Sequence, residues 1–120
     1  CAETWAGEKR PLARRVAAPA FPGGPCYELD RDFAPFAAAS LAGAPVVVDE
    51  LGLIELASPE FAAAVAKLFR GSAPVLAVIQ RRALGRWTEL IGRDRVGPVL
   101  EIDAAARAAA PAAIAARFRA

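Results

Sequence analysis

Two adjacent carboxylates, Asp49 and Glu50, are the residues of this chain best suited to chemistry. They follow residues 46–48, three valines after a Gly-Ala-Pro break, and this β-branched run predicts a short strand buried on both faces. In an open parallel sheet, ligands bind at the carboxyl ends of the strands, where these two acids stand. Their oxygens could hold Mg²⁺ or act on a water molecule, although a strand can also simply end in solvated acids.

An apolar strand that ends in two acids is also what a Walker B motif provides. The first acid holds Mg²⁺ and the second acts on the attacking water of a nucleoside triphosphatase. The residues that follow extend this pattern at fixed spacing. Residues 49–61, DELGLIELASPEF, resemble the D-E-I/L-G-x-M/I-E-L-x-S-x-x-F block of the small P-loop nucleoside-triphosphatase family, also called cancer-related nucleoside-triphosphatases.

Three other segments are similar to patterns of that family. Residues 7–14, GEKRPLAR, look like its G-x-x-x-P-L-A-R portion. Residues 27–30, YELD, followed by Phe33, are similar to its Y-x-V-D-x-x-x-F element. Residues 106–114, ARAAAPAAI, are similar to N-R-x-x-x-P-x-x-I, except that Ala106 stands in the usual Asn position. The resemblance therefore covers most of the chain.

The resemblance implies an α/β fold class: a partial P-loop NTPase-like three-layer fold with a mainly parallel sheet and flanking helices. It also implies Mg²⁺-dependent hydrolysis of nucleoside 5'-triphosphates to diphosphate and phosphate. Asp49 would hold Mg²⁺ directly or through water, and Glu50 would orient or deprotonate the attacking water. Arg81 and Arg82 stand where family members usually carry a basic or polar cluster, which would bring them near the triphosphate. These arginines could equally pair with nearby acids or be solvated.

The phosphate-binding loop of such an enzyme is absent from the sequence. A P-loop needs glycines whose N–H groups cradle phosphates, a Lys on the β- and γ-phosphates and a Ser or Thr on Mg²⁺. No G-x-x-x-x-G-K-S/T occurs, and neither Lys9 nor Lys67 follows the required glycines. The chain also has no Met and begins at Cys1, so we expect a missing N-terminal phosphate-loop segment upstream.

We therefore expect residues 1–120 to form a single incomplete domain that is inactive by itself. The alternative is a non-catalytic α/β interaction module that has lost the phosphate-binding loop. Adjacent unpaired carboxylates at a sheet rim favour the enzyme, because a binding module has little use for them.

Residues 1–44 should contain a β-hairpin, a Pro/Gly-rich loop and a helix. The hairpin would turn near residues 7–10, and the helix would run from an N-cap at Asp30 or Asp32 to a stop at Gly43. Residues 45–120 should contain the Walker B strand and the C-terminal α/β part.

Within that second part, the pattern predicts a helix over residues 59–70, with Ser58 as its N-cap, and then a buried strand over residues 75–79. Such a strand, helix and strand form a parallel unit. A short helix ending near Gly92, a third strand over residues 98–102 and two helical pieces after Asp103 should follow, with Pro111 opening the second piece.

Composition excludes several classes of protein. A formal net charge of +2, from 15 basic and 13 acidic residues, is not that of a specific nucleic-acid binder. Without His and with only two Cys, the chain cannot form a zinc site with the usual ligands, so any metal must be held by oxygen. The cysteine count also predicts no disulfide framework and a reducing, cytoplasmic location. The longest uncharged run, residues 33–48, is shorter than the roughly 20 residues of a membrane span, so no membrane segment is expected.

Overall fold

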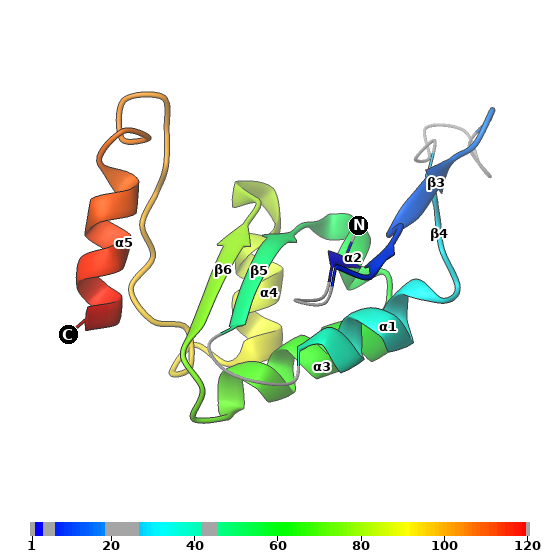
Figure 1. Ribbon diagram of the computed structural model, residues 1–120, viewed down its shortest axis with the longest axis horizontal. Helices are drawn as coiled ribbons and strands as arrows, with labels where there is room; N and C mark the ends of the chain where they lie inside the picture. Colours follow the sequence, from blue (N-terminus) through cyan, green and yellow to red (C-terminus); the bar gives the residue numbers. More distant parts are fainter. Residues whose placement is uncertain (1, 4–6, 19–26, 42–45, 120) are drawn as a thin grey trace.

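Two parallel strands, β5 (Val46–Leu51) and β6 (Val75–Ile79), lie side by side in the middle of the fold (Figure 1). The structure is a computed structural model that describes residues 2–3, 7–18, 27–41 and 46–119. In the ladder, Val46 is opposite Val75 and Val48 is opposite Ala77. The predicted α/β class and the predicted parallel pairing of these two runs are therefore confirmed.

Helix α3 (Pro59–Arg70) connects the two strands, as the sequence predicted. Ser58 is the N-cap, and its hydroxyl oxygen accepts a hydrogen bond from the N–H of Phe61 at 3.4 Å. Pro59 stands in the first turn, where the helix needs no N–H donor, and Gly71 is the C-cap. The helix buries one stripe of side chains at helical spacing: Phe61, Ala62, Val65 and Ala66.

The core lies between β5 and three helices. These are α1 (Phe33–Ser40), α3 and α4 (Leu84–Ile91), the last preceded by the 3-10 turn η1 (Arg81–Ala83). Leu51, Val65 and Trp87 are fully buried, and the rings of Phe33 and Phe61 meet edge to face with centroids 5.5 Å apart. Because burial of large apolar side chains is the main stabilising force, this cluster holds the carboxyl end of β5 firmly against α3 and α4.

The expectation that residues 46–48 are buried on both faces is wrong for the described chain. Val46 and Val48 are each 7% exposed, whereas Val47 between them is 58% exposed. In β6, Val78 is also exposed. Alternate residues of a strand point to opposite faces, so the helices cover one face of the β5–β6 pair and leave the other open in the described part of the chain.

The N-terminal residues form two short antiparallel ladders. Strand β1 (Ala2–Glu3) pairs with β2 (Lys9–Arg10), and β3 (Ala13–Arg15) pairs with β4 (Tyr27–Leu29). A hairpin was predicted here, but Lys9 and Arg10 belong to its second strand and not to its turn. Most of the predicted Pro/Gly-rich loop, residues 19–25, lies outside the described residues.

Helix α1 begins close to the predicted position. Asp32 is its N-cap without a side-chain capping bond, while the Asp30 carboxylate accepts a hydrogen bond from the Asp32 N–H at 2.9 Å. The helix ends at Ser40, before the predicted stop, and Gly43 lies outside the described residues.

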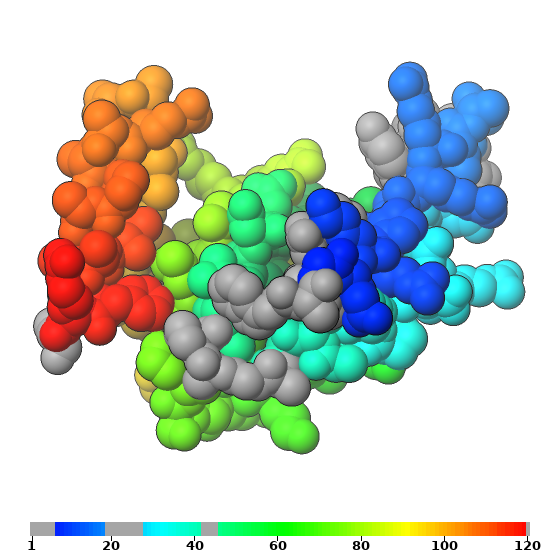
Figure 2. Space-filling view, in the orientation of Figure 1, coloured from blue at the N-terminus to red at the C-terminus, as the bar shows by residue number. Residues whose placement is uncertain are grey.

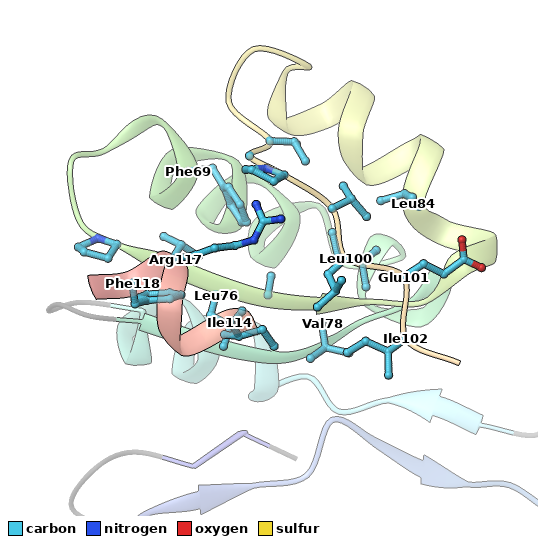
Figure 3. Close-up of a pocket in the computed structure, with 18 of the residues that line it drawn as sticks. Phe69, Leu76, Val78, Leu84, Leu100, Glu101, Ile102, Ile114, Arg117 and Phe118 are labelled. Atoms are coloured by element: carbon cyan, nitrogen blue, oxygen red, sulfur yellow. The ribbon is translucent and has the colours of Figure 1, made fainter. Parts of the chain in front are cut away.

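The predicted third strand over residues 98–102 is wrong. These residues have no regular secondary structure, and Val99 is 60% exposed. A strand requires a hydrogen-bonded neighbour, and the ladders of the described chain do not include this segment. The segment instead runs beside the open face of β6 towards the C-terminal helix (Figure 3).

The C-terminal helix α5 (Ala110–Arg119) begins with Pro111 in its first turn, as predicted. The first predicted helical piece is a series of turns over residues 104–109, although the Asp103 carboxylate accepts a bond from the Ala106 N–H at 2.7 Å in the manner of a cap. Figures 1 and 2 show α5 and these turns as a ridge along one side of the molecule. None of the helices in the described chain is long and apolar enough to cross a membrane.

Candidate active site

Asp49 and Glu50 lie inside β5, near its end. The sequence placed the end of the strand at Val48, but the ladder continues to Leu51, whose side chain is buried in the core. Both acids are exposed. Because β5 and β6 are parallel, their carboxyl ends meet at the same edge, and Gln80, which follows β6, contacts Glu50 there.

The ladder is irregular at Glu50. Asp49 is opposite Val78 and Leu51 is opposite Ile79, so β5 contains one residue more than β6 over this step. Such an inserted residue is a β-bulge, which changes the direction of a side chain and is common beside active sites. The bulge therefore lies at Glu50, the acid that Gln80 contacts.

Glu50 contacts β6 through a side-chain hydrogen bond. Its Oε1 accepts a bond from Gln80 Nε2 at 2.7 Å, and Gln80 Oε1 accepts one from Arg82 Nε at 3.4 Å. The structure thus links Arg82 to the acid pair through Gln80. Sequence reasoning did not assign a role to Gln80, although a polar residue immediately after an apolar strand, at the same edge as the acids, is a signal that could have found it.

Arg81 contacts a different part of the chain from Arg82. Its guanidinium forms an exposed ion pair with Glu101, in the segment between α4 and α5. This is the alternative that the sequence left open for these arginines, pairing with an acid. The two predicted arginines are therefore separated: Arg82 faces the Glu50 side of the strand end, and Arg81 joins η1 to the C-terminal segment.

The Asp49 carboxylate has no hydrogen-bond or ion-pair partner among the residues that the structure describes. That part of the chain also contains no group of three or more His, Cys, Asp and Glu side chains arranged to hold a metal ion. Mg²⁺, however, is commonly bound by one or two carboxylates, with phosphate and water oxygens as its other ligands. An exposed carboxylate beside a second one is a donor set that fits this mode of binding.

The turn after the acids is fixed by buried hydrogen bonds. The Gly52 N–H donates to Glu55 Oε2 at 2.8 Å, and the Gly52 carbonyl accepts a bond from Trp87 Nε1 at 3.0 Å. Glu55, in the short helix α2 (Leu53–Leu56), is only 6% exposed. Within the block DELGLIEL, the third acid is therefore a structural residue that holds the chain immediately after Glu50.

An apolar groove of about 670 Å³ lies away from the acids, between β6, the segment before α5, and α5 itself. Figure 3 shows side chains of all three directed into it, and Phe69 of α3 at its end. Its lining includes Leu76, Val78, Leu100, Ile114 and Phe118 but neither Asp49 nor Glu50. The groove and the acid pair are therefore separate features of the surface.

A protein-family model described as NTPase matches residues 7–115 of this chain. The match extends from the residues before β2 into α5, and it includes β5, the bulge, β6 and η1. No curated protein and no solved structure matches the chain.

Proposed function

The chain belongs to the NTPase family, and on that basis we propose that it carries the metal- and water-handling part of a Mg²⁺-dependent nucleoside triphosphatase. The family indicates a nucleotide-binding hydrolase. The proposed reaction is hydrolysis of a nucleoside 5'-triphosphate to the diphosphate and phosphate. The likeness of residues 49–61 to the Walker B block of the small P-loop, or cancer-related, nucleoside-triphosphatases supports this more specific activity.

One observation carries the proposal: two exposed carboxylates share the carboxyl edge of parallel strands, and they have different surroundings. Asp49 has no side-chain partner in the described chain, whereas Glu50 is held by Gln80. A carboxylate without a partner is suited to a hard cation, and an oriented carboxylate is suited to accept a proton from water. Phosphoryl transfer requires both functions side by side.

In the proposed mechanism, Asp49 would hold Mg²⁺ directly or through a water ligand. The bound ion would neutralise the charge that develops on the β- and γ-phosphate oxygens. Glu50 would use Oε2 to accept the proton of the attacking water, because Gln80 occupies Oε1. The water oxygen bonds to the γ-phosphorus in line with the departing diphosphate oxygen, and the bond to that oxygen breaks.

Arg81 and Arg82 would provide positive charge near the triphosphate. Arg82 has the more direct position because Gln80 connects it to Glu50, whereas Arg81 would first have to leave Glu101. The phosphate cradle would come from an N-terminal phosphate-loop segment outside these 120 residues, since the sequence contains no G-x-x-x-x-G-K-S/T.

The alternative, a non-catalytic α/β interaction module, is favoured by the open apolar groove beside β6. The coding sequence upstream of Cys1 distinguishes the two functions. A phosphate-loop motif there supports the enzyme, and its absence supports the interaction module.

The activity test uses a longer form of the protein that includes the upstream segment. We expect this form to release phosphate from ATP or another nucleoside triphosphate only when Mg²⁺ is present. Glu50→Gln should lower the rate by roughly 10²- to 10⁴-fold, the usual contribution of a general base. Glu89→Gln is the matched control, because Glu89 is an exposed acid on α4 outside the site. A loop-containing form without hydrolysis would contradict the proposed function.

A further inference from the structure

We infer that Gln80 is a positioning residue for Glu50, and that Gly52 is a glycine because any side chain there would displace the Gln80 amide. The inference rests on the proposed function, since it gives Glu50 a reason to be oriented. It adds two residues, Gln80 and Gly52, to the site, and neither is assigned by the family match.

The chemistry of the three contacting groups determines the orientation of the Gln80 amide. A carboxylate can only accept hydrogen bonds and a guanidinium can only donate them. An amide placed between Glu50 and Arg82 must therefore direct its NH₂ group to Glu50 and its oxygen to Arg82. The observed contacts, 2.7 Å from Nε2 to Glu50 Oε1 and 3.4 Å from Arg82 Nε to Oε1, have this orientation. The reverse orientation would place oxygen against oxygen and nitrogen against nitrogen.

The backbone of Gln80 is fixed relative to Glu50. Its N–H donates to the Leu51 carbonyl at 3.0 Å, which ties it to the residue that follows Glu50 in β5. Its own carbonyl accepts a bond from the Ala83 N–H at 2.8 Å, at the end of η1. With both backbone groups bonded, the side chain extends towards Glu50 from a defined point.

Gly52 borders the same amide. A Cβ at this position would lie 2.7 Å from Gln80 Cδ and 2.8 Å from Nε2, closer than such atoms can approach. The φ of Gly52 is −114°, an extended conformation that any residue can adopt. A side chain at position 52 would therefore be accommodated by movement of the Gln80 amide, the far end of a flexible side chain, and the backbone conformation would not oppose it.

For catalysis, the consequence is that Gln80 holds the Glu50 carboxylate through Oε1, which leaves Oε2 available to bond a water molecule. Loss of this contact would leave Asp49, the proposed metal ligand, unchanged. We therefore expect Gln80→Ala to lower kcat by about 3- to 10-fold, the effect of one ordinary solvent-exposed hydrogen bond, with little change in KM. Gly52→Ala should have a similar effect.

The first test needs no nucleotide. In the 120-residue chain, the side-chain amide of Gln80 should give a distinct ¹⁵N–¹H resonance pair. At one fixed pH, both Glu50→Ala and Gly52→Ala should shift this pair towards the position of a free glutamine amide, while Glu89→Ala should leave it in place. A Gln80 pair that does not move in Glu50→Ala would overturn the inference.

The second test is a double-mutant cycle in the form that contains the phosphate loop. If Gly52 acts only through Gln80, Gly52→Ala should lower kcat in the parental protein and have no further effect when Gln80 is already Ala. A glycine required for general packing would give the same loss in both backgrounds, and this result would overturn the role of Gly52. A Gln80→Ala variant with parental kcat would overturn the positioning role of Gln80.

The outcomes separate the inference from the proposed function. If the parental protein hydrolyses triphosphate and Glu50→Gln does not, the proposed function stands and the cycle tests Gln80 and Gly52. If the parental protein does not hydrolyse triphosphate, the proposed function fails. The resonance test still shows, independently, whether Gln80 contacts Glu50.

Discussion

Two residues that are neighbours in the sequence, Asp49 and Glu50, differ in what surrounds their carboxylates. Glu50 is in a bulge and accepts a bond from Gln80, whereas Asp49 has no partner in the described chain. A side chain with one oxygen already bonded is a poorer metal ligand and a better oriented base than one with both oxygens available. The geometry thus gives a physical reason to assign different roles to two similar acids.

Amide substitutions of the two acids should therefore have different kinetic effects. In the form with the phosphate loop, Glu50→Gln keeps the size of the side chain but removes the base, so turnover should fall by roughly 10²- to 10⁴-fold while nucleotide affinity is retained. Asp49→Asn should instead raise the Mg²⁺ concentration needed for half-maximal activity. Hydrolysis rates and nucleotide affinity measured over a Mg²⁺ series test both. Parental turnover by Glu50→Gln would mean that another group is the base.

The sequence predicted the acid pair and its place at a strand end, but not which side chain would contact it. The contact between Gln80 and Glu50 depends on the register of β5 against β6 and on the bulge at Glu50. Register is a property of the paired strands and is not encoded in either run alone. Nor could the sequence separate Arg81 from Arg82, because the partner of Arg81 is Glu101, in a segment whose position depends on the tertiary fold.

At the scale of elements, the turn between β5 and α3 joins the site to the core. Glu55 and Trp87 bind the N–H and the carbonyl of Gly52 from two different helices, α2 and α4. The acid pair immediately before this turn is therefore held by contacts that do not involve the acids themselves. A change in these contacts should alter stability before it alters chemistry.

Loss of the buried Glu55 carboxylate should destabilise the fold. Glu55→Ala would leave the Gly52 N–H buried without an acceptor, at a cost of about 1–3 kcal/mol. Glu55→Gln should cost less, because an amide oxygen can still accept the bond. Urea unfolding of both variants, with Glu89→Ala as an exposed control, measures the difference. Equal midpoints for Glu55→Ala and the control would show that this hydrogen bond does not hold the turn.

The sequence predicted a helix or strand well where residues within that element determine it. It predicted poorly where the element needs a neighbouring strand from elsewhere in the chain. Ser58, Pro59 and Gly71 define the ends of α3 by their own backbone and capping chemistry, and that helix was predicted correctly. Residues 98–102 have the composition of a strand, but composition indicates only that a segment suits a pleated, half-buried surface. Without a neighbouring strand in the described chain, the segment stays irregular and exposes Val99 and Ile102.

At the scale of the molecule, the proposed function divides a nucleotide site between the acid edge and a phosphate cradle. β5, β6 and the helices α3 and α4 form the support for Asp49, Glu50 and Gln80. Cradling of β- and γ-phosphates relies on successive backbone N–H groups of a glycine-rich loop at a helix N-terminus. The sequence of this chain contains no such loop motif, so in the proposed function its residues would supply the metal and water contacts and the two nearby arginines, but no phosphate cradle.

We therefore expect the 120-residue chain by itself not to bind a nucleoside triphosphate tightly. The negative charges of the two carboxylates repel a triphosphate unless Mg²⁺ lies between the carboxylates and the phosphates. One or two arginines cannot replace the full set of backbone N–H donors of a phosphate loop. Calorimetric titration with Mg²⁺ and ATP should show no saturable heat in the micromolar range, and the form with the phosphate loop, titrated identically, is the positive control. A micromolar dissociation constant for the 120-residue chain would show that its own residues hold the phosphates, with Arg81 and Arg82 the first candidates for substitution.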